Sequence, residues 1–239
     1  MQKVETRDPY LTYYGIQFFV DVDGIGTTDN YFRWKMEETW EYHAQHLITH
    51  YYDNGMIDAY SYTDNIWECW GTRPVPMVFT KSTTDLNENN LRKVPLNYVS
   101  NQTERLKIRY SLLVKQYSLS RKAFNYWNEL KLQSQETGGL YEGQPVTISG
   151  NIYNSSDSDE IVLGYFDASA VQEKRILVEN TFDFWIFNST CLYDTLTVGQ
   201  LVERFGANPA EPILLHIIPV GNEIRYGYTH QPCFLFKST

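Results

Sequence analysis

The chain has 239 residues, of which 42% are hydrophobic and 21% are charged. This composition is typical of a globular protein that buries a core, and it argues against global disorder. The formal net charge is -9, and the sequence contains no cluster of basic residues, which argues against nucleic acid as a partner. No apolar run reaches the length of a membrane span, so we expect a soluble chain.

The N-terminal part predicts two strands. Residues 1–12 are polar, and we expect a flexible lead-in there, followed by one β-rich domain over residues 13–239. Residues 16–22 are aromatic and β-branched, which predicts a strand. In residues 31–42 the side chains alternate between two faces as far as Glu37, which predicts a second strand. Together the two segments predict a hairpin with a long tip.

The next part predicts short extended segments separated by turns. Asn54-Gly55 is a turn signal, and residues 67–70 predict a short strand that Gly71 closes. Further extended segments are expected at residues 77–80 and 94–99, on either side of a polar loop at residues 83–92.

A strand followed by an amphipathic helix is the clearest prediction. Residues 106–116 predict the strand, and Ser120 is the expected N-cap because its hydroxyl can accept from a free helix amide. Residues 121–135 predict the helix, since their apolar positions recur three and four apart. These positions are Ala123, Phe124, Trp127 and Leu130. The pair Gly138-Gly139 is expected to end the helix, whose apolar stripe needs a sheet to cover.

The remaining elements are expected to be strands joined by hairpins, with one short helix. The expected strands are residues 145–152, 160–166, 174–178, 213–220 and 224–228, and the short helix is residues 198–205. The predicted fold is therefore mainly β, an antiparallel sandwich or barrel-like sheet, with one amphipathic helix packed on it at about residues 121–135.

The three cysteines, Cys69, Cys191 and Cys233, are widely spaced and form no CxxC motif. This pattern excludes zinc-knuckle and thioredoxin-like motifs. The odd count leaves at least one thiol free or bound to another chain, and whether the cysteines form a disulfide stays open.

Three histidines, His43, His46 and His50, recur at helical spacing. Imidazoles one helical turn apart can share a metal ion. The segment has no HExxH motif and no carboxylate that completes the spacing, so a solvated loop is the favoured interpretation. We predict neither a metal nor a cofactor.

Acidic residues offer two further chemistries, calcium binding and glycoside hydrolysis. The candidates are Asp21, Asp23 and Gly24 or residues 154–159 for calcium, and Glu37 with Glu38 or Asp157 with Asp159 for hydrolysis. Neither calcium candidate has the spacing of a calcium loop, and acidic pairs in β proteins are mostly solvated. No G-x-S-x-G nucleophile motif occurs. We predict that the protein is not an enzyme and has no catalytic residue, and a glycan-acting hydrolase is the alternative.

Short glycosylation motifs also occur. The N-x-S/T tripeptides at Asn101, Asn154 and Asn188 mark surface loops if the source glycosylates asparagine. The tripeptide Asp194-Thr195-Leu196 resembles a short O-glycosylation sequon of Bacteroidota.

Several segments resemble one family in their order and spacing. They are residues 30–42 (NYFRWKMEETWEY), 109–131 (RYSLLVKQYSLSRKAFNYWNELK), 138–145 (GGLYEGQP), 150–152 (GNI) and 162–169 (VLGYFDAS). On these segments the chain resembles the family called domain of unknown function 4249, over about residues 16–233.

The resemblance implies a cellular context rather than a chemistry. Family members resemble secreted lipoproteins of Bacteroidota, often encoded beside TonB-dependent outer-membrane receptors. They usually carry an N-terminal immunoglobulin-like domain and a lipobox, so this chain resembles only their C-terminal domain. The resemblance implies a non-catalytic accessory or ligand-binding domain at the surface or periplasmic face of the outer membrane. Its implied partner is a TonB-dependent receptor or a nutrient, and its membrane anchor is a lipid outside this chain.

Overall fold

The computed structural model describes residues 1–7, 12–24, 26, 29–43, 48–59, 68–136, 147–157, 159–187 and 194–228. Over these residues the chain is mainly β, with three sheets and two α-helices, which confirms the predicted fold class. No helix in the described ranges is both long and apolar enough to cross a membrane.

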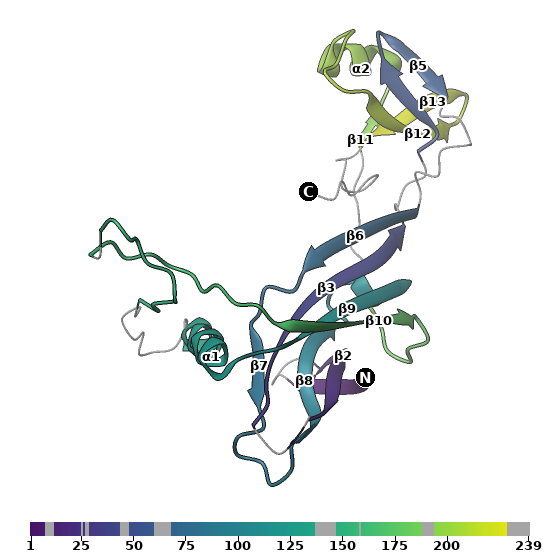
Figure 1. Cartoon of the computed structure of the whole chain (residues 1–239). Helices are drawn as coiled ribbons and strands as arrows, with labels where there is room; N and C mark the ends of the chain where they lie inside the picture. Colours follow the sequence, from purple (N-terminus) through teal and green to yellow (C-terminus); the bar gives the residue numbers. More distant parts are fainter. Residues whose placement is uncertain are drawn as a thin grey trace. The chain divides into compact units, whose positions relative to one another are not determined.

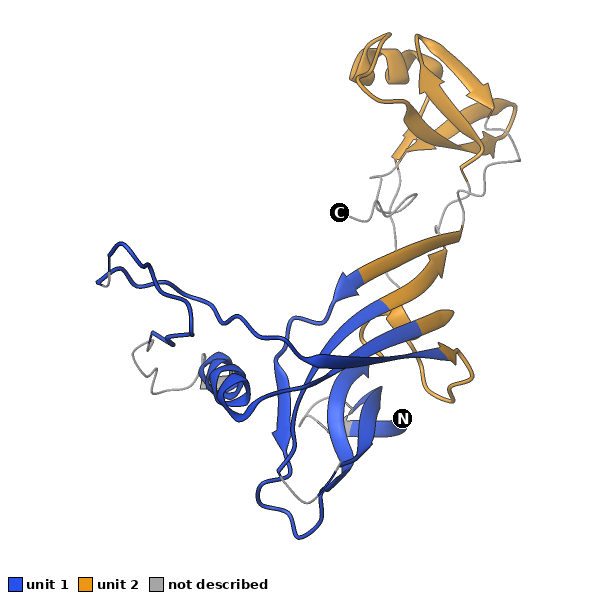
Figure 2. Ribbon diagram, in the orientation of Figure 1, with its two compact units in different colours: residues 1–38, 73–100, 111–177 blue, residues 39–72, 101–110, 178–239 orange. Residues whose placement is uncertain are grey.

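The chain forms two compact units, which Figure 2 shows in different colours. Unit 1 comprises residues 1–38, 73–100 and 111–177. Unit 2 comprises residues 39–72, 101–110 and 178–239. Several strands have residues in both units. The expectation of one domain over residues 13–239 stays a prediction.

The first sheet has the order β1-β2-β8 and lies within unit 1. Its strands are β1 (Gln2–Arg7), β2 (Thr12–Asp23) and β8 (Asn90–Ser100). β2 pairs antiparallel with both neighbours, and two register shifts against β8 mark bulges. The prediction of a flexible lead-in is wrong for residues 2–7, because this polar segment forms an edge strand whose amides pair with β2. β8 also extends well beyond the predicted residues 94–99.

The second sheet has the order β10-β9-β3-β6, and β7 also pairs with β3. Its strands are β3 (Tyr31–His43), β6 (Glu68–Pro74), β7 (Phe79–Ser82), β9 (Arg109–Ser118) and β10 (Ala170–Glu179). Figure 1 shows β3 and β9 side by side in the middle of this sheet. The predicted hairpin of residues 16–22 with 31–42 is wrong, because β2 and β3 belong to different sheets. Periodicity identifies a strand but not its partner.

Two predicted strand limits also change. The strand predicted from residue 106 begins at Arg109, because residues Glu104–Leu106 form a 3₁₀ turn that buries Leu106. Gly71 does not close its strand, since β6 continues to Pro74. The ring of Trp40 packs directly on Gly71, where a Cβ atom would lie only 2.5 Å from the ring, so the contact requires glycine.

Side chains on β3 alternate as predicted. Phe32, Trp34, Met36 and Glu38 are buried, and the residues between them are more exposed. The buried face forms part of the core of unit 1, where Trp34 is only 1% exposed. The burial of Glu38 was not predicted, since a carboxylate is placed inside only with a partner.

Helix α1 (Arg121–Glu136) confirms the predicted helix. The Ser120 hydroxyl accepts a hydrogen bond from the Ala123 amide at 3.2 Å, as expected of an N-cap. The apolar stripe faces strands β3 and β7: Phe124 packs on the Tyr31 ring, 5.2 Å between centroids. The Thr80 hydroxyl on β7 donates to the Asn128 side-chain oxygen at 3.1 Å. The glycines expected to end the helix lie outside the described residues.

The third sheet has the order β11-β13-β12-β4-β5 and lies within unit 2. Its elements are β4 (His50–Asp53), β5 (Met56–Ala59), β11 (Asp194–Leu196), α2 (Val198–Phe205), β12 (Ile213–Val220) and β13 (Glu223–Tyr228). The predicted short helix, the β12–β13 hairpin and the Asn54-Gly55 turn are confirmed, the turn with φ of 49° and 72°. A core of Tyr52, Leu196, Leu201 and Leu215 joins α2 to the sheet.

The segment of residues 147–169, here called the arm, differs from the prediction. Strands were predicted at residues 145–152 and 160–166, but the described residues of both segments form no strand. The two sides nevertheless run together, because the Asn151 side chain accepts from the Phe166 amide and donates to its carbonyl, both at 2.8 Å. A Cβ atom at Gly150 would lie 1.5 Å from the Gly164 carbonyl oxygen, so the backbones touch without a regular ladder.

Trp127 on α1 tests whether the helix stripe contributes to stability. Its ring centroid lies 3.2 Å from the guanidinium carbon of Arg33, and burial lowers the pKa of Arg33 to about 10. Because the indole is only partly buried, Trp127→Ala is expected to lower the free energy of unfolding by about 2 kcal/mol. Urea denaturation measures this, with Leu132→Ala on the exposed face as the matched control, expected to change it by under about 0.5 kcal/mol. A loss below about 1 kcal/mol for Trp127→Ala contradicts the packing role.

Candidate functional site

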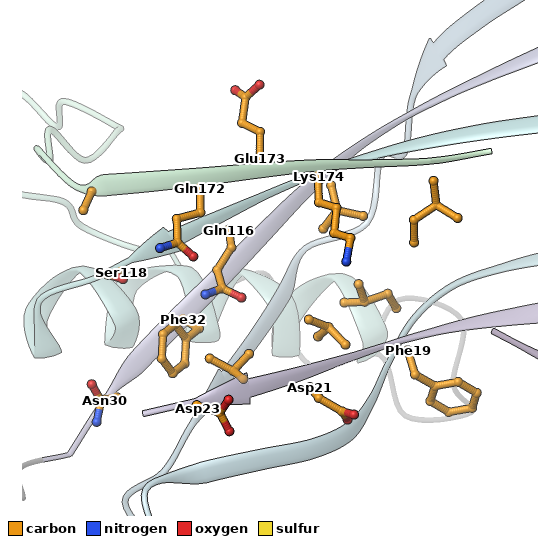
Figure 3. Close-up of a pocket in the computed structure, with 16 residues that line it drawn as sticks. Phe19, Asp21, Asp23, Asn30, Phe32, Gln116, Ser118, Gln172, Glu173 and Lys174 are labelled. Atoms are coloured by element: carbon orange, nitrogen blue, oxygen red, sulfur yellow. The ribbon is translucent and has the colours of Figure 1, made fainter. Parts of the chain in front are cut away.

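A groove of about 770 Å³ lies within unit 1, lined by residues of the first and second sheets. Its apolar lining residues are Phe19, Val20, Val22, Phe32, Leu96, Val114, Ala170 and Ile176. Its polar and charged lining residues are Asp21, Asp23, Asn30, Gln116, Ser118, Gln172, Glu173 and Lys174. Figure 3 shows these side chains. The volume is within the range of small-molecule sites in proteins, which is about 300–1,000 Å³.

Strand periodicity determines which side chains enter the groove. On β9, Val114, Gln116 and Ser118 share one face, and all three line the groove. On β10, Gln172 and Lys174 share the face that enters the groove. Figure 3 shows the Glu173 carboxylate on the opposite side of β10 from these two side chains. The face of β9 and β10 that lines the groove therefore carries amide and ammonium groups, and Gln172 and Lys174 are exposed on it.

The opposite face of the same strands carries paired charges. Lys115 Nζ lies 3.0 Å from Glu173 Oε1, and this hydrogen bond raises the pKa of Lys115. Arg175 lies 3.7 Å from Glu37 and donates to the Ser111 hydroxyl at 2.8 Å. The side chains of both ion pairs point to the other side of their strands from Lys174.

Gln116 links the groove to the core. Trp34 Nε1 donates to Gln116 Oε1 at 2.9 Å, and the Trp34 side chain is almost fully buried. This hydrogen bond fixes the amide so that its carbonyl oxygen faces the core. The amide nitrogen is then directed to the groove as a donor.

Two carboxylates of β2 stand at the edge of the groove and bind groups of β8. Asp21 Oδ1 accepts from the Lys93 amide at 2.6 Å, and Asp23 Oδ1 pairs with Arg92 at 2.6 Å. Both aspartates are exposed. Their contacts tie β2 to β8, and among the described residues Asp21 and Asp23 do not belong to a group of three or more His, Cys, Asp or Glu side chains that could share an ion.

Of the carboxylate pairs considered for hydrolysis, Glu37 and Glu38 do not face one ligand. Glu37 and Glu38 point to opposite faces of β3, and Glu38 is buried against Arg73 Nε at 2.6 Å. Asp157 accepts from the Asp159 amide at 3.0 Å at the exposed tip of the arm. The calcium candidate at residues 154–159 is a turn held by such local bonds.

His43 and His50 do not lie on one helix face. His43 lies on β3 and His50 on β4, while His46 lies outside the described residues. His43 Nε2 lies 2.9 Å from Glu41 Oε1, and Glu68 joins this pair. A hydrogen bond from Arg109, together with one from His43, lowers the pKa of Glu41 in spite of its burial. The other two members of the cluster are the carboxylates of Glu41 and Glu68, which the histidine pattern in the sequence did not point to.

Cys69 is buried and is not part of a disulfide, while Cys191 and Cys233 lie outside the described residues. The glycosylation motif at Asn101 does not mark a surface loop, because Asn101 is 3% exposed and its amide donates to the Trp185 carbonyl at 2.9 Å. Asn154 lies at the arm tip, and Asn188 is outside the described residues. Asp194 of the O-glycosylation motif pairs with Arg204 at 3.1 Å.

The arm carries large apolar side chains in solvent. Its most exposed members are Tyr153, Ile161, Leu163 and Phe166, each at least two thirds exposed. Tyr165, between the last two, instead stacks on Tyr126 of α1 with 5.0 Å between ring centroids. Apolar side chains gathered on one projecting segment are typical of a surface that another molecule covers.

The model of the family described as domain of unknown function 4249 matches residues 2–175. The chain belongs to this family. Neither the search of curated proteins nor that of solved structures found a match. The family match ends before residue 233, where the resemblance was expected to end, and its span leaves out β11, β12, β13 and α2.

The span shared with the domain of unknown function 4249 family includes every groove residue except Ile176. Sequence reasoning did not single out Gln116, Gln172 or Lys174. A signal was present on β9, where Val114, Gln116 and Ser118 alternate with Lys115 and Tyr117, so that both faces of the strand carry polar groups. When the face of a strand that is turned to the protein interior also carries polar side chains, the strand is more typical of a groove wall than of a closed core.

The Trp34–Gln116 hydrogen bond tests how the groove is fixed. Gln116→Met keeps the side-chain length but leaves the buried indole N–H without its acceptor, so the free energy of unfolding should fall by about 1–3 kcal/mol. Urea unfolding followed by tryptophan fluorescence measures the change. Gln172→Met on the neighbouring strand is the control, expected within about 0.5 kcal/mol of the wild type. Equal stabilities of Gln116→Met and the wild type contradict the role of this bond.

Proposed function

We propose that the protein is a non-catalytic, extracytoplasmic ligand-binding domain of a surface lipoprotein of Bacteroidota, which serves a TonB-dependent outer-membrane uptake system. The chain belongs to the domain of unknown function 4249 family, and the resemblance of its members to lipoproteins encoded beside such receptors supports this context. The membrane attachment is then a lipid on the full-length protein.

The polar inner face of the groove carries the ligand-binding part of the proposal. Gln116, Gln172 and Lys174 supply donors, while Phe32 and Val114 supply apolar contact. Half of the lining residues are polar or charged, so the groove offers hydrogen-bonding groups beside apolar walls, and both kinds of group occur in small-molecule sites. Donors of this kind suit a neutral, hydroxyl-rich ligand such as a short oligosaccharide, whose oxygen atoms accept and whose ring faces pack on phenylalanine.

The alternative, a glycan-acting hydrolase, requires an acid and a second carboxylate facing one ligand. Asp21 and Asp23 line the groove, but each binds a group of β8, and Glu173 pairs with Lys115. These contacts favour structural roles for the three carboxylates. Binding without hydrolysis is therefore the better-supported function.

A binding experiment tests the groove. Neutral oligosaccharides are titrated into the chain, and the fluorescence of Trp34 reports occupancy, because its indole bonds to Gln116 at the groove wall. Gln172→Ala is expected to weaken binding by about tenfold, since one hydrogen bond contributes about 0.5–1.5 kcal/mol. Lys115→Ala, on the opposite face of β9, is the matched control and should bind as the wild type does.

Three outcomes count against this assignment. No saturable response to any oligosaccharide contradicts the ligand class, and equal weakening by Gln172→Ala and Lys115→Ala contradicts the location. Release of new reducing ends from the oligosaccharide, lost in Asp21→Asn or Asp23→Asn, supports the hydrolase instead.

Exposed apolar side chains of the arm support the partner. If the arm docks on a TonB-dependent receptor, charging it should abolish the contact, because a buried unpaired carboxylate is costly. Epitope-tagged full-length protein is recovered from native membranes, as wild type or as the double variant Ile161→Asp with Leu163→Asp. The wild type is expected to bring down a receptor and the variant to lose it.

The matched control for the arm is Leu132→Asp on the exposed face of α1, which should keep the receptor. Mass spectrometry identifies what is recovered. Recovery of the wild type without any TonB-dependent receptor contradicts the partner, and retention of the receptor by the arm variant contradicts the arm as its docking segment.

A further inference from the structure

Glu41, His43 and Glu68 form a cluster in unit 2 that the proposed function does not use. One ligand atom from each side chain lies within 4.8 Å of the other two. Glu41 and His43 come from β3, two residues apart and therefore on the same face, and Glu68 comes from β6, its neighbour in the sheet. The sheet itself thus brings the three groups together, without a dedicated loop.

We propose that Glu41, His43 and Glu68 bind a divalent transition-metal ion of the zinc type. This proposal departs from the sequence prediction of no metal, which did not consider Glu41 or Glu68 as ligands. It is independent of the groove and of its ligand.

The ligand types favour this class of ion. One imidazole with two carboxylates suits zinc and similar ions, whereas calcium and magnesium prefer oxygen ligands alone. Three protein ligands leave further positions for water. His43 is about one quarter exposed and Glu68 is exposed, so the ion has an entrance from solvent on their side.

Distances in the cluster fit with a small adjustment. Ligand atoms about 2.0–2.2 Å from one zinc ion lie roughly 3–4 Å from one another. His43 Nε2 and Glu41 Oε1 are 2.9 Å apart, so this pair is close to the required separation. The ligand atom of the exposed Glu68 lies within 4.8 Å of both, so a small shift of this side chain completes the required separations.

Arg109 positions the buried ligand. Its Nε donates to Glu41 Oε2, while Oε1 faces His43, so the two carboxylate oxygens have separate roles. The guanidinium also lies 5.1 Å from the Trp70 ring centroid. A ligating carboxylate whose second oxygen is held by a donor is the usual outer-sphere arrangement of metal sites. The two carboxylates of the cluster outnumber the one guanidinium that Arg109 brings to it, which favours a cation there.

The test uses the purified chain without a histidine tag, treated with EDTA and desalted. Zn²⁺ is titrated by calorimetry, and Co²⁺ is titrated by visible absorption, which reports nitrogen and oxygen ligation. The wild type is expected to bind one ion per chain. His43→Gln and Glu68→Gln should each weaken binding by at least about tenfold, as loss of a metal-site group does.

His50→Gln on β4 is the matched control, and it should bind within about twofold of the wild type, because His50 is not in the cluster. Zn²⁺ should raise the melting temperature of the wild type but not that of Glu68→Gln. If His43→Gln does not fold, Glu68→Gln on the exposed side carries the test alone. Absence of saturable binding, or equal affinity in the wild type and Glu68→Gln, overturns the proposal.

Discussion

Two carboxylates on one strand constrain the second sheet. Glu38 and Glu41 of β3 are 1% and 2% exposed, less than neighbouring apolar residues such as Phe32. Burying a carboxylate, like burying any ion, costs roughly several kcal/mol of folding free energy unless a charged hydrogen-bond donor contacts it. Arg73 of β6 meets Glu38, and Arg109 of β9 meets Glu41, so both strands that flank β3 supply an arginine. The position of each arginine therefore fixes how its strand aligns with β3.

The groove follows from the same alignment. Because side chains alternate along a strand, moving β9 by one residue would remove Arg109 from Glu41 and also turn Gln116 away from the groove. The hydrogen bond between Trp34 and Gln116 favours the same register from the core side. The sheet can therefore keep its register with polar side chains in the groove, because the Arg109–Glu41 and Trp34–Gln116 contacts favour that register.

Local features were predictable from the sequence, and long-range pairings were not. The helix at residues 121–135, the Ser120 cap and the Asn54-Gly55 turn depend on neighbouring residues, and all three are confirmed. The hairpin of residues 16–22 with 31–42 was wrong because pairing depends on partners far along the chain. Arm strands were predicted from β-branched residues, yet Gly150 and Gly164 bring the backbones too close for a ladder. The groove residues were missed because they come from strands far apart in the sequence, and only the pairing of these strands brings them to one groove.

The metal proposal and the structural role of Glu41 are compatible because its two oxygens differ. Arg109 holds Oε2, and this hydrogen bond raises the pKa of Arg109, so the contact between β3 and β9 does not depend on an ion. His43 holds Oε1, and an imidazole can exchange a proton for a metal. A cation bound between Glu41 Oε1 and His43 Nε2 would replace only the hydrogen bond between these two atoms. The sheet can therefore bind and release the ion without losing the arginine contact that fixes its register.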